Sequence, residues 1–188
     1  MLTEQEFLVL NSLYLKKMTS VCGLADIAGL SVGEVQPLVG RFTAQNWVMD
    51  LGDELVIQPG GMVEVESYYR EVFTDPALQD GIAQWYRRFE TVNTRFIKLV
   101  SDWQQSDGDA KVLDRIVSTV ERLINSIGEV THLVPRYSGY VRRFERSIAK
   151  VDRGDLDFVC TPTVDSVHNI WFELHEDALL LLGKERTE

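Results

Sequence analysis

The chain has 188 residues, 45% hydrophobic and 26% charged, which is enough for one large domain or two small ones. A net charge of −10 and the absence of low-complexity tracts exclude a basic or compositionally disordered protein. No apolar run reaches the roughly 20 residues that cross a bilayer, and the N-terminus lacks signal-peptide features, so we expect a cytoplasmic protein.

The first predicted helix begins with a capping box formed by Thr3 and Glu6. Lys16 and Lys17 follow at its end, where positive charge suits the helix dipole. Between the two ends, apolar side chains recur at helical spacing: Phe7, Leu10, Leu13 and Tyr14.

The next stretch, LADIAGLSVGEVQPLV, resembles a helix-turn-helix signature. Ala25 is the small residue where the two helices would touch, and Gly29 is the positive-φ residue of the turn. Ser31 and Glu34 form a second capping box that begins the second helix. We expect three apolar side chains to fill the shared core: Leu30, Val35 and Leu38.

Two short apolar segments, WVMDL and ELVIQ, flank a Gly52-Asp53 turn and predict a β-hairpin. Pro59-Gly60-Gly61 ends the hairpin, and a further helix follows to about Tyr69. This order of helix, helix-turn-helix, hairpin and helix resembles the MarR-like and related winged-helix families over residues 3–73. We therefore assign a winged-helix domain to residues 1–75.

The winged-helix fold usually binds DNA, but the charge of this domain is unfavourable for contact with phosphate. Residues 1–75 contain four basic and eleven acidic side chains, a net charge of −7, with Asp50, Asp53 and Glu54 in the wing. The predicted recognition helix, residues 32–45, contains an interior Pro37 that removes a backbone donor. Its candidate DNA-binding residues are Gln36, Arg41, Thr43 and Gln45. Two interpretations remain open: a DNA-binding regulator, or a winged helix that contacts protein or forms a dimer.

Residues 76–188 change to longer helical periods and predict an antiparallel bundle of four amphipathic helices. The breaks fall at residues 106–109, at Pro135 and at residues 152–155. The apolar stripes run over residues 82–103, 113–127, 140–151 and 167–182. The predicted fold class is thus mainly α, with an N-terminal winged helix and its short hairpin followed by this bundle.

Polar side chains on the apolar faces of the bundle are the candidates for a ligand pocket. Asn93 must find a partner inside, Asp165 is placed to orient the ring of His168, and Arg136 offers a fork to a carboxylate or phosphate. A pocket for a small anionic or aromatic molecule would use Asn93, Trp103, Arg136, Tyr137, Asp165, His168, Trp171 and His175. The alternative is that the histidines are structural and bond to neighbouring helices.

The same helical rotation places Glu173 opposite Trp171, so we expect Glu173 to be solvated and not to form one site with Glu176 and Asp177. His168 and His175 are two turns apart, which does not favour a metal site.

No motif nominates an enzyme or a bound cofactor: the chain lacks a G-x-S-x-G sequence, a phosphate-binding loop, a dinucleotide fingerprint and zinc-type cysteine pairs. Cys22 and Cys160 lie in apolar stretches of different predicted domains, so we expect two buried free thiols.

Three segments carry a second resemblance: RFIKLVSDWQQ, VPRYSGYVRRFERSIAKVDRGD and DSVHNIWFELHEDALLLLGKER. They resemble, over about residues 85–186, a family of winged-helix proteins whose helical domain ends in a D-S-x-H-x-x-W-F-E-L-H-E-D motif. That family is associated with pyruvate, phosphate dikinase and other phosphoenolpyruvate-utilising enzymes. The chain has no nucleotide-grasp domain, so the resemblance implies an accessory or regulatory partner, with His168 and His175 as the foremost candidates.

These observations predict a homodimeric transcriptional regulator whose bundle mediates dimerisation or senses a small-molecule effector. The alternative is an interaction protein that does not bind DNA and docks on a phosphoenolpyruvate-utilising enzyme.

Overall fold

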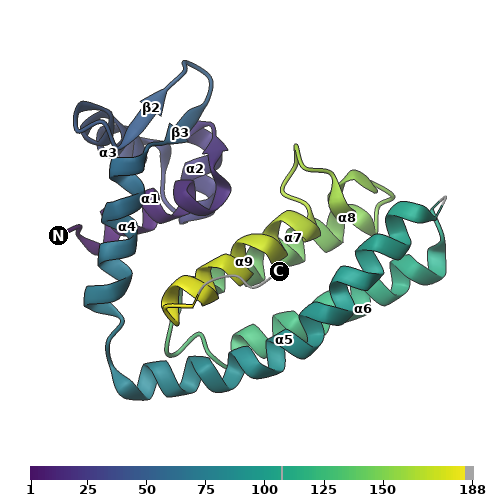
Figure 1. Ribbon diagram of the computed structural model, residues 1–188. Coiled ribbons are helices and arrows are strands. Elements are labelled where there is room, and N and C mark those ends of the chain that lie inside the picture. The colour runs from purple at the N-terminus through teal and green to yellow at the C-terminus, as the bar shows by residue number, and fades with distance from the viewer. Residues whose placement is uncertain (107, 185–188) are drawn as a thin grey trace. The chain divides into compact units, whose positions relative to one another are not determined.

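A computed structural model describes residues 1–106 and 108–184 of the chain, which is mainly α-helical with one small antiparallel sheet, as the sequence predicts (Figure 1). The chain divides into two compact units: Met1–Asp75 with Leu179–Lys184, and Pro76–Ala178. Within the described residues, no helix is long and apolar enough to cross a membrane.

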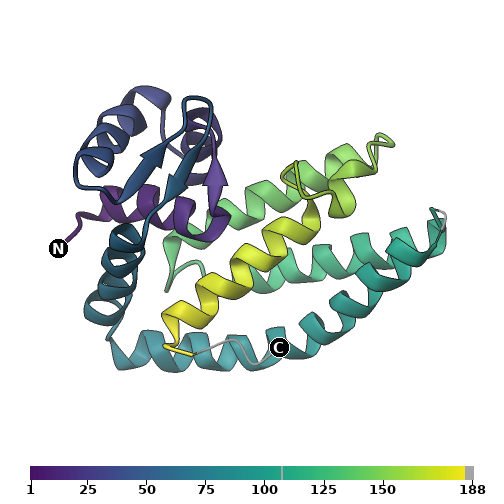
Figure 2. The same cartoon turned by 45° about the horizontal axis from the view of Figure 1, so that its top comes forward.

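The N-terminal unit combines helices with one small antiparallel sheet. Its three antiparallel strands are arranged β1-β3-β2, so the first short strand pairs with the hairpin (Figure 2). The sequence did not predict β1. The elements are α1 (Glu4–Lys16), β1 (Met18–Thr19), α2 (Val21–Ala28), α3 (Val32–Ala44), β2 (Val48–Asp50), β3 (Leu55–Ile57) and α4 (Pro59–Val72).

Local capping explains where the helices of this unit begin and end. The Thr3 backbone N–H donates to Glu6 Oε2 over 2.7 Å, and the Thr3 hydroxyl accepts from the Glu6 N–H over 3.3 Å. Ser31 and Glu34 repeat this reciprocal pair at the start of α3. Gly29 ends α2 with φ of 71°, the left-handed conformation that glycine adopts without strain. Both predicted capping boxes and the predicted turn are confirmed.

Aromatic side chains of α1 and α4 form the core of the N-terminal unit. The Phe7 ring stacks on Tyr68 with 4.0 Å between centroids, and Tyr69 donates its buried hydroxyl to Asn11 Oδ1 over 3.0 Å. Val35 and Leu38 are buried as predicted, but Leu30 is only half-buried. Leu30 lies in the turn after α2, where its side chain keeps contact with solvent.

The second unit contains the bundle, in which the long helices follow one another through short connections (Figure 1). Asp109 caps the second long helix by accepting the Lys111 N–H at Oδ1 over 2.8 Å. Two short elements, η1 and α8, were not predicted. The elements are α5 (Pro76–Gln105), α6 (Ala110–Gly128), η1 (Pro135–Tyr137), α7 (Ser138–Val151), α8 (Asp157–Cys160) and α9 (Val167–Leu181), of which α9 belongs to this unit up to Ala178.

The prediction for the cysteines is half right. Both thiols are free, but Cys22 is exposed and Cys160 is half-buried. On α2 the buried positions are Leu24 and Ala25, so the rotation of this short helix turns Cys22 toward solvent.

Candidate functional site

The four candidate DNA-binding residues lie together on or just after α3. Gln36, Arg41 and Thr43 are exposed on the helix, and Gln45 is exposed at its C-cap. Arg41 is the single basic residue of α3, and its guanidinium lies 2.8 Å from Glu6 Oε1 of α1. One face of α3 is thus exposed to solvent, but Arg41, the only cation of this helix, is paired with Glu6.

Glu6 serves both as the capping residue of α1 and as the partner of Arg41. The hydrogen bond from the Thr3 backbone N–H, followed by smaller contributions from the Thr3 hydroxyl and the Arg41 charge, holds the pKa of Glu6 below its usual value. Much of the remaining exposed face of α3 is uncharged: Gly33, Gln36, Pro37 and Gly40. The helix continues through Pro37.

The outer face of the sheet carries a row of exposed apolar side chains. Met18 of β1 and Met49 of β2 both pair with Val56 of the central strand, so all three side chains share one face. Met18 is 48% exposed and Met49 is 45% exposed, and Leu51 at the hairpin tip is 59% exposed. We call Met18, Met49, Leu51 and Val56 the wing patch.

Carboxylates surround the tip of the wing patch. The hairpin turn is closed by the Leu51 N–H, which donates to the Glu54 carbonyl over 2.9 Å. The Gly52 N–H donates to Asp50 Oδ1 over 2.8 Å, and Gly52 has φ of 95°. This turn exposes Asp50, Asp53 and Glu54 beside Leu51. At the opposite edge of the sheet, the Lys17 ammonium lies over the Tyr14 ring at 4.3 Å.

Three of the eight candidate pocket residues meet in the aromatic core of the bundle. The Trp171 indole N–H donates to Asn93 Oδ1 over 2.9 Å, which confirms that Asn93 has a partner inside. The His175 ring nitrogen Nε2 lies 2.9 Å from the Tyr86 hydroxyl. The Phe89 ring packs against both Trp171 and His175. These contacts join α9 to α5.

On its other side, α9 and the residues just before it are joined to η1 and α7 by a row of buried and half-buried polar groups that we call the polar ladder. Arg136 pairs with Asp177, and the Tyr140 hydroxyl donates to Asp177 Oδ2 over 3.0 Å. Arg143 donates to Asp165 through Nε (2.9 Å) and Nη2 (2.6 Å), and to Glu173 Oε2 over 2.6 Å. The ladder thus consists of Arg136, Tyr140, Arg143, Asp165, Glu173 and Asp177.

The prediction that Glu173 is solvated is wrong, because Glu173 is only 3% exposed and pairs with Arg143. The carboxylates of Glu173 and Asp177 pair with different arginines, Arg143 and Arg136. Along α9, buried residues point toward α5 and toward α7, so the face opposite Trp171 meets protein rather than water.

Arg143 remains a cation although its side chain is only 4% exposed. Burial opposes the charge, but the hydrogen bonds that Arg143 donates to Asp165 and the charges of Glu173 and Asp165 outweigh it and raise the pKa of Arg143. Sequence reasoning missed Arg143, although one signal was present. Arg136, Tyr140 and Arg143 are spaced by four and three residues, as are side chains on one helical face.

The other candidate pocket residues lie apart from the aromatic cluster. Tyr137 is fully buried against Trp85 and Tyr140, and His168 is half-buried in the first turn of α9. Trp103 is half-buried near the end of α5 and hydrogen-bonds Cys160, a thiol whose pKa is raised by burial. The predicted set therefore does not form one site: several of its members connect helices, and they lie in different parts of the bundle.

Within the part of the chain that the structure describes, no group of three or more His, Cys, Asp or Glu side chains is arranged to hold a metal ion. Comparison of the chain with protein-family models, with curated proteins and with solved structures finds no match. A functional proposal must therefore rest on the geometry of the chain itself, above all on the exposed wing patch.

Proposed function

We propose that the N-terminal unit is a winged-helix module that binds a protein partner through the wing patch. The observation that carries this proposal is the pairing of Met18 and Met49 with Val56 on an exposed sheet face, with Leu51 at its tip. A contiguous exposed apolar face of this kind is typical of interaction surfaces. Methionine suits such a surface because its flexible thioether adapts to the shape of a partner.

The charges beside the wing patch define the chemistry of the partner. Asp50, Asp53 and Glu54 are exposed at the hairpin tip, and residues 1–75 carry a net charge of −7. Complementary potential steers encounter and fixes register at protein interfaces. We therefore expect a protein surface with an apolar protrusion flanked by Lys or Arg side chains.

The same charges weigh against DNA as the ligand of this unit. Binding to a phosphate backbone draws most of its non-specific affinity from Lys and Arg contacts. Arg41 is already paired with Glu6, and the wing would bring three carboxylates toward the duplex.

Site-specific photo-crosslinking in cells tests the protein-docking proposal. A photoreactive amino acid at position 49 is expected to capture a defined protein, and the same group at Val63 of α4, which is 56% exposed, is the matched control. Leu51→Glu is expected to abolish capture from position 49. Phosphoenolpyruvate-utilising enzymes, to which the resemblance of the α9 motif points, are the first partners to test as purified proteins. Equal capture from both positions, or none from position 49, would contradict the proposal.

A DNA-binding regulator is the second candidate function, because α3 exposes Gln36, Arg41, Thr43 and Gln45 as a recognition helix would. A gel-shift assay at low salt with the DNA upstream of the gene separates the two candidates. Protein docking predicts no shift at micromolar protein, whereas a shift that Arg41→Ala removes would support the regulator. In that case a screen for metabolites that raise the melting temperature would test effector sensing by the bundle.

A further inference from the structure

The two methionines of the wing patch lie on either side of the central strand of the sheet. Met18 of β1 and Met49 of β2 are each paired directly with Val56 of β3. Because neighbouring strands lie about 4.8 Å apart, the Cα atoms of the two methionines are about 10 Å from each other, with Val56 between them. Both methionines are exposed and Val56 is half-buried, so the methionine side chains form the more accessible part of this face.

The core of the N-terminal unit lies behind the opposite face of the sheet. Side chains alternate between the two faces of a strand, so the neighbours of Met49 and Val56 along β2 and β3 point into the core. These neighbours are Val48, Leu55 and Ile57, which are buried. A polar group added to Met18 or Met49 therefore stays in contact with water and should leave the stability of the fold unchanged.

A thioether at such a position can be switched between an apolar and a polar form. With hydrogen peroxide, the sulfur gives an electron pair to one peroxide oxygen, the O–O bond breaks, and the other oxygen leaves as water. The product, methionine sulfoxide, is polar and disrupts surfaces that depend on methionine. Methionine sulfoxide reductases reverse the reaction: a pair of thiols is oxidised to a disulfide, and the sulfoxide oxygen leaves as water.

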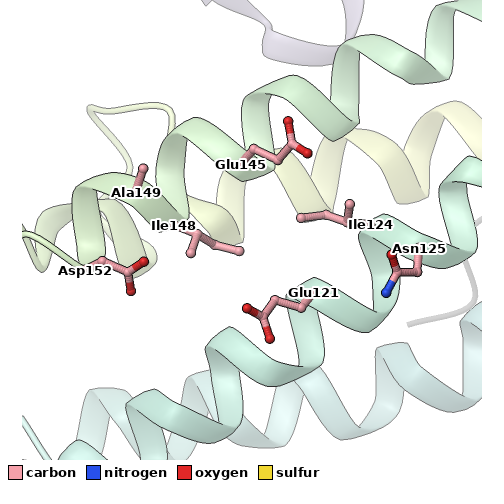
Figure 3. A pocket seen from close by; sticks show the side chains of 7 residues that line it. All are labelled: Glu121, Ile124, Asn125, Glu145, Ile148, Ala149 and Asp152. Atoms are coloured by element: carbon pink, nitrogen blue, oxygen red, sulfur yellow. The ribbon is translucent and has the colours of Figure 1, made fainter.

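The bundle carries a surface of different chemistry, a groove of about 470 Å³ between α6 and α7 (Figure 3). Its walls consist of carboxylate, amide and aliphatic side chains, among them Glu121, Asn125 and Ile148. None of the seven residues that line it contains sulfur. Mild oxidation with a peroxide therefore alters the wing patch and leaves this groove as it was.

We propose that oxidation of Met18 and Met49 by a peroxide switches off binding at the wing patch, and that reduction of the sulfoxides restores it. This switch rests on the proposed docking function of the wing patch. A partner that covers Val56 also contacts the methionines that flank it. A sulfoxide oxygen buried there without a donor across the interface is costly, and each one is expected to weaken binding about tenfold.

Hydrophobic-interaction chromatography of the full chain on a phenyl resin tests the change in polarity. After treatment with hydrogen peroxide, peptide mass spectrometry should find sulfoxide at Met18 and Met49 before Met62 of α4, which is half-buried. The oxidised protein should elute earlier than the parent and keep its melting temperature. Met18→Leu with Met49→Leu is the matched control: its patch stays apolar, so peroxide should not change its elution, although the exposed Met1 is oxidised in both proteins.

Photo-crosslinking from position 51 tests the effect on docking, because this position lies in the wing patch and leaves both methionines in place. Purified protein is oxidised, freed of peroxide and added to cell lysate at a limiting concentration. The yield of the product that the unoxidised protein captures should fall by about tenfold or more, and methionine sulfoxide reductases should restore it. The double leucine variant should capture the same product before and after peroxide treatment.

The outcomes distinguish failure of the switch from failure of docking. No capture by the unoxidised protein would overturn both. Capture that persists after oxidation of Met18 and Met49 would overturn the switch alone, as would unchanged elution from the phenyl resin. An equal loss of capture in the double leucine variant would place the oxidation effect at other residues and would overturn the switch as well.

Discussion

The two compact units of this protein place their charged groups in opposite ways. In the N-terminal unit, carboxylates such as Asp53 and Glu54 stand exposed at a hairpin tip beside apolar side chains. In the bundle, Arg143 and Glu173 are buried and paired between helices. An exposed charge contributes little to stability and is available to a partner, whereas a buried pair makes each member depend on the other. Substitution should therefore alter recognition in the first unit and stability in the second.

Substitution of Arg143 should cause the largest loss of stability. Arg143→Met keeps much of the side-chain volume but leaves Glu173 buried without its cation, which we expect to lower the free energy of unfolding by about 3–5 kcal/mol. Urea denaturation followed by circular dichroism measures this loss. Arg153→Met, at an exposed position in the turn after α7, is the control and should change the value by less than about 0.5 kcal/mol. Equal losses at the two positions would show that the buried pairs of Arg143 do not stabilise the bundle more than an exposed charge does.

The double variant Arg143→Met with Glu173→Met sharpens this prediction. If the penalty comes from an unpaired buried carboxylate, removing that carboxylate as well should restore a large part of the lost stability. Additive losses in the same urea experiment would mean that each side chain acts through packing instead.

Asn93→Leu is expected to cause a smaller loss of stability. The Trp171 indole N–H then loses its acceptor within a core where the rings of Trp171 and Phe96 stack with 3.7 Å between centroids. An unsatisfied buried donor costs about 1–3 kcal/mol, which chemical denaturation resolves. Thr91→Leu on the exposed side of α5 serves as the control. A stable Asn93→Leu protein would show that the hydrogen bond between α5 and α9 is dispensable.

In the N-terminal unit, loss of a helix cap should cost less. Thr3→Ala removes the side-chain half of the α1 capping box and is expected to destabilise the protein by about 1 kcal/mol. The bonds with Thr3 hold the pKa of folded Glu6 below its usual value, so their stabilisation is present above that value and is lost as the pH falls through the folded pKa. Thr3→Ala keeps the backbone N–H that lowers this pKa most and removes only the hydroxyl. The melting temperatures of parent and variant should therefore approach each other in acid by the hydroxyl's share of the effect, without becoming equal. A difference that grows as the pH falls would contradict this linkage.

Local patterns predicted those parts of the fold that depend on neighbours in sequence. The capping boxes at Thr3 and Ser31 and the turn at Gly29 involve residues at most a few positions apart. Strand β1 could not be predicted in this way, because its two residues become a strand only by pairing with Leu55 and Val56.

The polar ladder was missed for the same reason. Helical rotation correctly places Glu173 on the side of α9 opposite Trp171. A single sequence does not show that α7 covers the side on which Glu173 lies. The partner of Glu173, Arg143, is 30 residues away and is set by how two helices pack. The wing patch likewise arises from strand register, which places Met18 beside residues of a distant hairpin.

The smallest effect on stability should come from the hairpin tip, and it bears most directly on the comparison between the units. Asp53→Asn with Glu54→Gln removes two exposed charges that make no ion pair within the described residues. The free energy of unfolding should change by less than about 0.5 kcal/mol. Association with a basic partner should nevertheless slow and lose part of its salt dependence, because exposed charges act mainly on the rate of encounter. Kinetics by surface plasmon resonance with the crosslinked partner, at two salt concentrations, would measure this. Unchanged association would show that the apolar wing patch alone determines recognition and that its acidic surroundings are incidental.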